Sequence, residues 1–192
     1  MGRGADSLRE AVLAEGRVVG SLLMVDGFLN HRVDPPLLDA IGADLAARFA
    51  PAAPDLVVTA EASGIPPALT TATHLGVPML YAKKYLGPGD RNVFAREVQS
   101  PTRGTEYRVE IARRVLPAGL RVVIIDDFLA GGRTAEALGD IAEEASCTVV
   151  GFGFAVEKRF TGGRDRLEAR GWRVEALVTV TSLEGGRVSL AD

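Results

Sequence analysis

Two adjacent aspartates and a glycine-rich turn are the features of this sequence best suited to chemistry. Asp126 and Asp127 end an apolar run, and the turn 130–134, Ala-Gly-Gly-Arg-Thr, follows shortly after them. Glycines let backbone N–H groups approach an anion closely, and aspartates accept hydrogen bonds from sugar hydroxyls. A lone aspartate pair would favour an ordinary solvated turn. The complete pattern favours a site for a phosphorylated sugar.

The elements around this motif are the ones that such a site needs. Residues 121–126 predict a buried strand, and residues 133–145 predict a helix that begins at the turn. Ligands of open parallel sheets bind beyond the carboxyl ends of strands, and a helix N-terminus attracts phosphate. The sequence lacks the spacing of a P-loop and of a dinucleotide-binding glycine motif, which argues against both classes.

A second candidate site follows the predicted strand 56–60. Its backbone N–H groups and one hydroxyl suit a pyrophosphate, although a plain tight turn into the helix that starts at Pro66 is about as compatible with the sequence. Two lysines at the end of the next predicted strand, 77–82, could neutralise the same anion. The residues concerned are Glu61, Ala62, Ser63, Gly64, Lys83 and Lys84.

The remaining pattern predicts a single α/β domain over residues 1–192, with its core from about residue 51. There, short apolar runs alternate with helical stretches, which indicates a largely parallel central sheet flanked by helices. The first 50 residues predict an appendage over one end of the sheet. In it we expect a capping box at residues 7–10, a helix ending near Gly16, an extended piece 17–26 and a helix capped by Asp34. The polar stretch 83–106 predicts a long loop, with 85–107 as a candidate lid.

Composition and charge exclude several classes of protein. The 22 Lys and Arg against 25 Asp and Glu leave a net charge of -3, which argues against nucleic-acid binding. Cys147 is the only cysteine, so an internal disulfide is impossible and a reducing compartment fits best. The sequence shows no signal peptide and no apolar stretch near the roughly 20 residues that span a bilayer. We expect a soluble, cytoplasmic protein with no membrane partner.

The stretch 122–134 resembles the signature of type I phosphoribosyltransferases for phosphoribosyl pyrophosphate (PRPP). The resemblance implies that family's fold, with an N-terminal and C-terminal hood over the active site. It implies that Asp126 and Asp127 are the catalytic pair at the ribose diol and that Mg²⁺ enters bound to PRPP, with no direct protein ligand. The implied PRPP-binding residues are Ala130, Gly131, Gly132, Arg133 and Thr134, and the implied pyrophosphate-binding residues are Glu61, Ala62, Ser63, Gly64 and Lys84.

Four further segments narrow the resemblance. Residues 25–35, 61–65, 76–84 and 156–165 are similar to segments of bacterial xanthine phosphoribosyltransferases. This implies a homodimeric enzyme of purine salvage that converts xanthine and PRPP to xanthosine 5′-monophosphate and diphosphate. The family pattern puts Leu23, Asn30 and Lys158 at the purine.

The chemistry of these residues agrees with what the resemblance implies. Lys158 offers three donors and no acceptor, which suits the carbonyl at position 6 of an oxopurine and rejects an amino group. Asn30 can donate to the second carbonyl, which distinguishes xanthine from hypoxanthine, and Leu23 can form an apolar wall. Displacement at the anomeric carbon needs no nucleophilic side chain, because positioning, electrostatic stabilisation and exclusion of water can carry it.

Two alternatives stay open from the sequence. One is a hypoxanthine-guanine or adenine phosphoribosyltransferase, which Lys158 and Asn30 disfavour by the reasoning above. The other is a PRPP-sensing regulator that keeps the phosphate turn without turnover, although the first 50 residues do not look like a DNA-reading module. His31 and His74 are weak candidates for acid–base chemistry, and His74 is expected to be structural.

Overall fold

An eight-stranded sheet forms the centre of the computed structural model, which describes residues 2–85, 92–99 and 106–191. The strand order is β10-β9-β8-β7-β3-β4-β6-β5. The five strands from β9 to β4 are parallel, whereas β10, β6 and β5 are antiparallel to their neighbours, so the expected largely parallel sheet is confirmed. The strands are β3 (Leu56–Ala60), β4 (Met79–Tyr85), β5 (Val93–Gln99), β6 (Glu106–Ala112), β7 (Arg121–Leu129), β8 (Thr148–Lys158), β9 (Val174–Ser182) and β10 (Ser189–Leu190).

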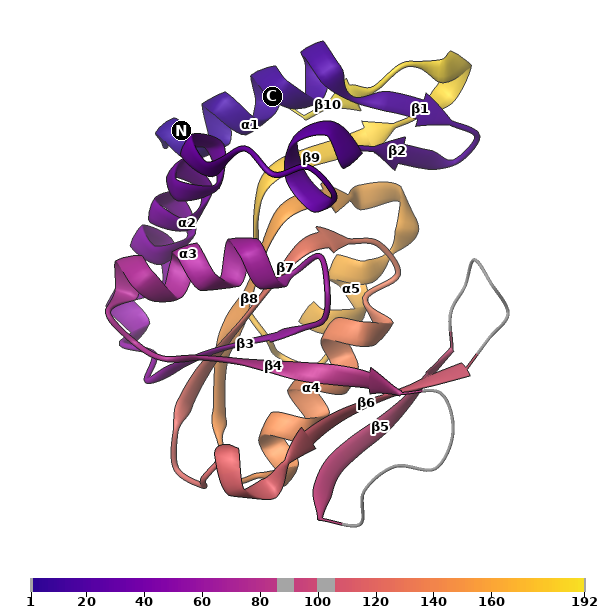
Figure 1. Cartoon of the computed structure of the whole chain (residues 1–192). Coiled ribbons are helices and arrows are strands. Elements are labelled where there is room, and N and C mark those ends of the chain that lie inside the picture. The colour runs from indigo at the N-terminus through magenta and orange to yellow at the C-terminus, as the bar shows by residue number, and fades with distance from the viewer. Residues whose placement is uncertain (1, 86–91, 100–105, 192) are drawn as a thin grey trace.

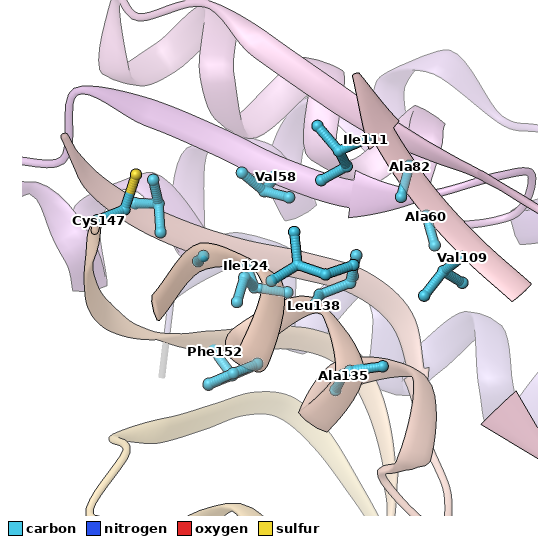
Figure 2. Close-up of a cluster of buried hydrophobic side chains, with 14 of the residues drawn as sticks. Val58, Ala60, Ala82, Val109, Ile111, Ile124, Ala135, Leu138, Cys147 and Phe152 are labelled. Carbon is cyan, nitrogen blue, oxygen red and sulfur yellow. The ribbon is translucent and has the colours of Figure 1, made fainter. Parts of the chain in front are cut away.

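One face of the sheet is covered by α4 (Arg133–Glu144), beside the short α5 (Gly163–Glu168). Leu138 of α4 packs in one buried cluster with Ile124 of β7 and Phe152 of β8, and all three side chains are fully buried. Figure 2 shows these side chains meeting between the helix and the strands. The buried stretches of the central strands, such as residues 122–125 of β7, are continuously apolar because both of their faces are covered.

The opposite face is covered by α1 (Arg3–Glu15), α2 (Pro35–Phe49) and α3 (Ile65–Leu75). Residues Ile41, Leu45 and Phe49, spaced by four, put one side of α2 into a second buried cluster with Val123 of β7. Within the described residues, none of the helices combines the length and apolar character that crossing a membrane requires.

The hood is the group of segments above the carboxyl ends of the parallel strands (Figure 1). It contains the hairpin of β1 (Arg17–Val19) and β2 (Leu22–Met24), the five-residue π-helix η1 (Asp26–Asn30), and the end of β9 with β10. The Arg9 guanidinium of α1 donates to the carbonyl oxygen of Ala191. Segments from both ends of the described chain are therefore bound together in the hood.

The start of α1 corrects one prediction. The helix begins at Arg3 rather than at a capping box at residues 7–10, and its N-cap is Gly2, which makes no side-chain cap. The backbone N–H of Ala5 instead donates to the Asp44 carboxylate of α2, at 2.9 Å. A partner from another helix thus satisfies the first turn, which a local sequence pattern cannot reveal. The predicted end near Gly16 and the Asp34 cap, which accepts from the backbone N–H of Leu37 at 3.0 Å, are confirmed.

The polar stretch 83–106 corrects another prediction, because much of it is sheet rather than loop. β5 and β6 pair as antiparallel strands from Val93 opposite Ala112 to Gln99 opposite Glu106. Phe94, Val98, Val109 and Ile111 are buried, and most of the residues between them are polar. An antiparallel strand needs apolar residues only on the face that packs against the core. The polar residues of the other face concealed this alternation in the sequence. The other parts of the predicted lid, 86–91 and 100–105, lie outside the described residues.

Candidate active site

The carboxyl ends of β3, β7 and β8 lie at one edge of the sheet, beneath the hood (Figure 1). The turn that begins at Glu61 follows β3, the aspartate pair lies near the end of β7, and Lys158 ends β8. Parallel pairing thus gathers three of the sequence-predicted groups from segments that are far apart in the chain.

The two aspartates form a closely coupled pair at the centre of this edge. Asp127 is 5% exposed, and its backbone N–H donates to the Asp126 carboxylate at 2.9 Å. Burial of the Asp126 carboxyl raises its pKa well above the ordinary value, and the neighbouring charge of Asp127 raises it further, while the Lys84 ammonium opposes both effects. A site that holds two carboxylates this close is prepared to receive hydroxyl donors or a cation.

The turn after β3 lies directly against this pair. A Cβ atom at Gly64 would lie 2.3 Å from an Asp126 carboxyl oxygen and 2.3 Å from the Thr59 hydroxyl oxygen, so only glycine fits there. The carboxylate of Glu61 accepts a hydrogen bond from the backbone N–H of Lys84 at 2.6 Å. The turn is therefore tied on one side to β7 and on the other to β4.

Residues 130–134, called the phosphate loop after the ligand expected from the sequence, lead into the N-terminus of α4. Gly132 has a φ of 76°, a left-handed conformation that favours glycine, and it is the N-cap of the helix. Gly132 has no side chain to cap this first turn, and N–H groups at the start of a helix suit an anion. The Thr134 hydroxyl lies 2.6 Å from the phenolic oxygen of Tyr107 on β6.

The two lysines at the end of β4 point in opposite directions, because side chains alternate along a strand. The Lys84 ammonium lies 5.4 Å from the centre of the Tyr107 ring, on the side of the site. Lys83 lines a separate cavity of about 290 Å³ with Tyr81 and Tyr85 on the other face. The expectation that both lysines could act on one anion is therefore wrong for Lys83 within a single chain.

The base side of the site combines a hood residue with the sheet. The Asn30 side-chain amide donates to the Asp127 carboxylate at 3.3 Å. The Lys158 ammonium lies 5.6 Å from the centre of the Phe128 ring, and burial lowers its pKa. Leu23, in contrast, is 6% exposed and belongs to the buried cluster of the hood, so its main contacts are with protein.

Comparisons with known proteins agree with this geometry. Residues 36–175 match the model of the phosphoribosyl transferase domain. The chain belongs to the phosphoribosyltransferase family. It is 47% identical to the xanthine phosphoribosyltransferase of Chloroflexus aurantiacus, over 94% of this chain and 86% of that protein. It is 44% identical to the xanthine phosphoribosyltransferase of Pseudomonas putida strain F1, over 97% of this chain and 100% of that protein.

Solved structures confirm the phosphoribosyltransferase fold. The adenine phosphoribosyltransferase of Rhodothermus marinus superposes with a TM-score of 0.74 at 27% identity, over 92% of this chain and 98% of that one. The enzyme of that name from Saccharomyces cerevisiae gives a TM-score of 0.73 at 24% identity, over 91% and 98% of the two chains. The expectation of a type I phosphoribosyltransferase fold with a mixed, mostly parallel sheet is thus confirmed.

The sequence reasoning missed three residues that contact the phosphate loop of this phosphoribosyltransferase or support the elements beside it. Tyr107 contacts Thr134, Arg166 donates to the carbonyl oxygen of Gly131 at 2.9 Å, and Arg164 pairs with the buried Glu157. Tyr107 lay in a segment that we predicted to be a loop. The two arginines are among many on the surface, and only their partners in the fold distinguish them.

No protein cage for a metal ion is evident in the part of the chain that the structure describes, because no three His, Cys, Asp or Glu side chains converge there. The Asp126–Asp127 pair supplies carboxylate oxygens, which Mg²⁺ prefers, but too few to fill its coordination shell. The donor set therefore fits an ion that keeps most of its ligands from substrate and water.

Proposed function

We propose that this phosphoribosyltransferase joins xanthine to the ribose 5-phosphate of PRPP, forming xanthosine 5′-monophosphate and diphosphate in purine salvage. The observation that supports the proposal is the contact between Asn30 of the hood and Asp127 of β7, because it links the amide that we assign to the base with an aspartate that we assign to the ribose. The sequence relatives named above, at 44–47% identity over most of the chain, support the same base.

The phosphate loop would hold the 5-phosphate of PRPP. The N–H groups at the start of α4 and the hydroxyl of Thr134 supply donors, and the dipole of the helix favours the negative charge. The ribose hydroxyls would donate to Asp126 and Asp127. The turn 61–64 and Lys84 would hold the pyrophosphate, because they lie on the Asp126 side of the same edge.

The base would be read by two donors. Lys158 donates to the carbonyl at position 6, and its half-buried position strengthens a charge-assisted hydrogen bond. Asn30 donates through the N–H that Asp127 does not occupy, to the carbonyl that hypoxanthine lacks. Leu23 would contribute through the shape of the hood, since its side chain is almost entirely buried.

The reaction is a displacement at the anomeric carbon, in which the bond to pyrophosphate breaks and a bond to a purine nitrogen forms. That nitrogen gives up its proton to the departing pyrophosphate or to water. Positive charge develops on the ribose, and the carboxylates of Asp126 and Asp127 stabilise it. The hood positions the base and excludes water from that carbon. Mg²⁺ bound to PRPP would neutralise phosphate charge and make pyrophosphate a better leaving group.

We also propose that the enzyme is a homodimer that acts in the cytoplasm. Tyr81 and Tyr85 lie on the face of β4 that points away from the site, and Val115 of the short helix Arg113–Val115 lines the same cavity. All three are 41–43% exposed, which suits a surface that a partner covers. Cys147 is a free, buried thiol, which suits a reducing compartment. Light scattering coupled to gel filtration measures the mass directly, and a monomer at all concentrations would refute the dimer.

Adenine is the second candidate base, because the solved structures named above are adenine phosphoribosyltransferases. The identity to them is 24–27%, well below the 41–47% to the xanthine enzymes. Lys158 has no acceptor for the amino group of adenine.

The deciding experiment is product formation from magnesium-PRPP with xanthine, guanine, hypoxanthine and adenine, each supplied separately. The proposal predicts the highest kcat/KM for xanthine. A preference for another base would retain the PRPP site and reject the role of Asn30. Binding of PRPP without turnover of any base would favour the PRPP-sensing regulator.

A further inference from the structure

The short helix α5 lies directly against the phosphate loop. A Cβ atom at Gly163 would lie 1.9 Å from the carbonyl oxygen of Ala130, and one at Gly132 would lie 3.0 Å from the carbonyl oxygen of Gly163. Backbone therefore meets backbone between the helix and the loop. Any displacement of α5 must move the residues that we assign to the 5-phosphate.

A side chain of α5 also holds the loop. The Arg166 guanidinium donates from Nε to the carbonyl oxygen of Gly131 at 2.9 Å and pairs with the Glu136 carboxylate at 3.1 Å. Engaging this carbonyl helps to fix the orientation of the peptide groups of the loop. Their N–H groups face the anion site only when that orientation is kept.

The other side of α5 is fastened to the strand that carries Lys158. Arg164 binds the carboxylate of Glu157 in a bidentate manner, with nitrogen–oxygen distances of 2.9 Å from Nε and 2.6 Å from NH2. It also donates to the carbonyl oxygen of Val174 at 2.8 Å. Glu157 is 1% exposed and directly precedes Lys158, so the ion pair is fixed to the backbone of the base-reading residue.

We propose that the buried Glu157–Arg164 pair is a positioning device that holds α5 between Lys158 and the phosphate loop. The pair thereby fixes the position of Lys158 relative to the loop. The proposal rests on the assigned roles of the phosphate loop and Lys158. Neither Glu157 nor Arg164 needs to touch a substrate. Both act through groups that do.

The ionic character of the pair supports this role. Burying two charges costs more than burying apolar side chains of similar size, so such a pair is a poor choice for stability alone. A bidentate contact between guanidinium and carboxylate restricts both distance and angle, which an apolar contact does not. The pair therefore suits a place where orientation matters.

The experiment replaces Arg164 with Lys, which keeps the charge and loses the bidentate geometry. Arg48→Lys is the matched control, because Arg48 also binds a carboxylate, of Glu175 at 3.2 Å, and a backbone carbonyl, of Ala176 at 3.0 Å. We expect Arg164→Lys to raise KM for both PRPP and xanthine and to lower kcat/KM by about tenfold to a hundredfold, as small misplacements do. Arg48→Lys should leave both KM values unchanged.

A readout independent of the base separates this proposal from the assignment of xanthine. Isothermal titration calorimetry with magnesium-PRPP alone should show weaker binding to Arg164→Lys than to wild type, even if the preferred base is not xanthine. A variant with a lower Tm, but with unchanged KM values and PRPP affinity, would make the pair merely structural and overturn the proposal.

Arg166→Gln provides a second test at a half-exposed position, in case Arg164→Lys does not fold. It removes the charge that holds the Gly131 carbonyl and leaves the ion pair with Glu157 intact. We expect its PRPP affinity to fall while KM for xanthine changes little. Unchanged PRPP affinity in this variant would show that α5 does not set the loop.

Discussion

The amide nitrogen of Asn30 lies 3.3 Å from a carboxylate oxygen of Asp127, and this contact joins the hood to the end of β7. A carboxylate accepts hydrogen bonds and repels an amide oxygen, so the contact decides which way the amide faces. Asp127 accepts from one N–H of this amide, and in the proposed function the other N–H binds the base. The residue that we assign to the ribose would thereby orient the residue that we assign to the purine.

Replacing Asn30 with Asp tests this relationship at almost constant size. The variant loses both N–H donors and puts a like charge beside Asp127. Hydrogen bonds between neutral and charged groups contribute about 1.5–3 kcal/mol, so kcat/KM for xanthine should fall by roughly one to two decades. Competition between xanthine and hypoxanthine measures the effect, and an unchanged ratio of the two would contradict the assigned role.

Lys158 should set the alkaline limit of the reaction. Burial lowers its pKa, so the ammonium donor is lost at a lower pH than for an exposed lysine. The variant Lys158→Arg keeps its charge at high pH, and the alkaline decline in kcat/KM should therefore move upward if the variant folds. Measuring both enzymes with the same base cancels the ionisation of the base itself. Coincident pH profiles would exclude Lys158 as the titrating donor.

Asp126 should cost the free protein stability near neutral pH. Its folded pKa is raised above the unfolded value. The protonated carboxyl therefore stabilises the fold fully below the unfolded pKa, and this contribution is lost as the pH rises through the folded pKa. Asp126→Asn removes the charge and should raise Tm at pH 7, by about 2–4 °C for each kcal/mol, while reducing turnover.

The gain in stability should grow as the pH rises from 4 to 7. Calorimetric scans over that range measure it for the wild type and for Asp126→Asn. Asp6→Asn, on the exposed surface of α1, is a control that should give no such gain. An Asp126→Asn variant that is less stable than the wild type at every pH would show that the aspartate pair is not under electrostatic strain.

Tyr107→Phe should weaken PRPP binding without affecting the base. The substitution keeps the ring beneath the Lys84 ammonium and removes the hydroxyl that contacts Thr134 at 2.6 Å. Loss of one neutral hydrogen bond costs about 1 kcal/mol, so KM for PRPP should rise about fivefold. Tyr81→Phe is the control, because Tyr81 lies on the face of β4 that points away from the site. Equal effects of the two substitutions on KM for PRPP would show that Tyr107 has no specific role in PRPP binding.

The sequence predicted the central part of the fold because local patterns there agree with the tertiary structure. The run 122–125 is apolar where β7 is covered on both faces, and Gly132 lies where a left-handed N-cap is needed. The aspartate pair, the phosphate loop and the turn after β3 could be found because each lies at the carboxyl end of a strand or just beyond it. Parallel strands then place such turns at one edge.

The features that the sequence did not reveal depend on contacts between distant segments. Asp44 of α2 supplies the cap that lets α1 begin early, and Tyr107 approaches Thr134 only because β6 pairs with β4. Lys83 and Lys84 point in opposite directions because β4 continues through both residues, and the sequence pattern had ended this strand at residue 82. Leu23 looks like a base contact by resemblance, yet the hairpin buries it in the hood.

The hood and the phosphate loop come from separate stretches of chain, and this separation bears on how such enzymes diverge. Hood residues 17–30 can change the chemistry offered to a base without altering residues 126–134, which we assign to the sugar phosphate. Selection for a new purine can therefore act on a short N-terminal segment while residues 126–134 are inherited unchanged. Such a division is one physical reason why one scaffold can give rise to enzymes for different nucleobases.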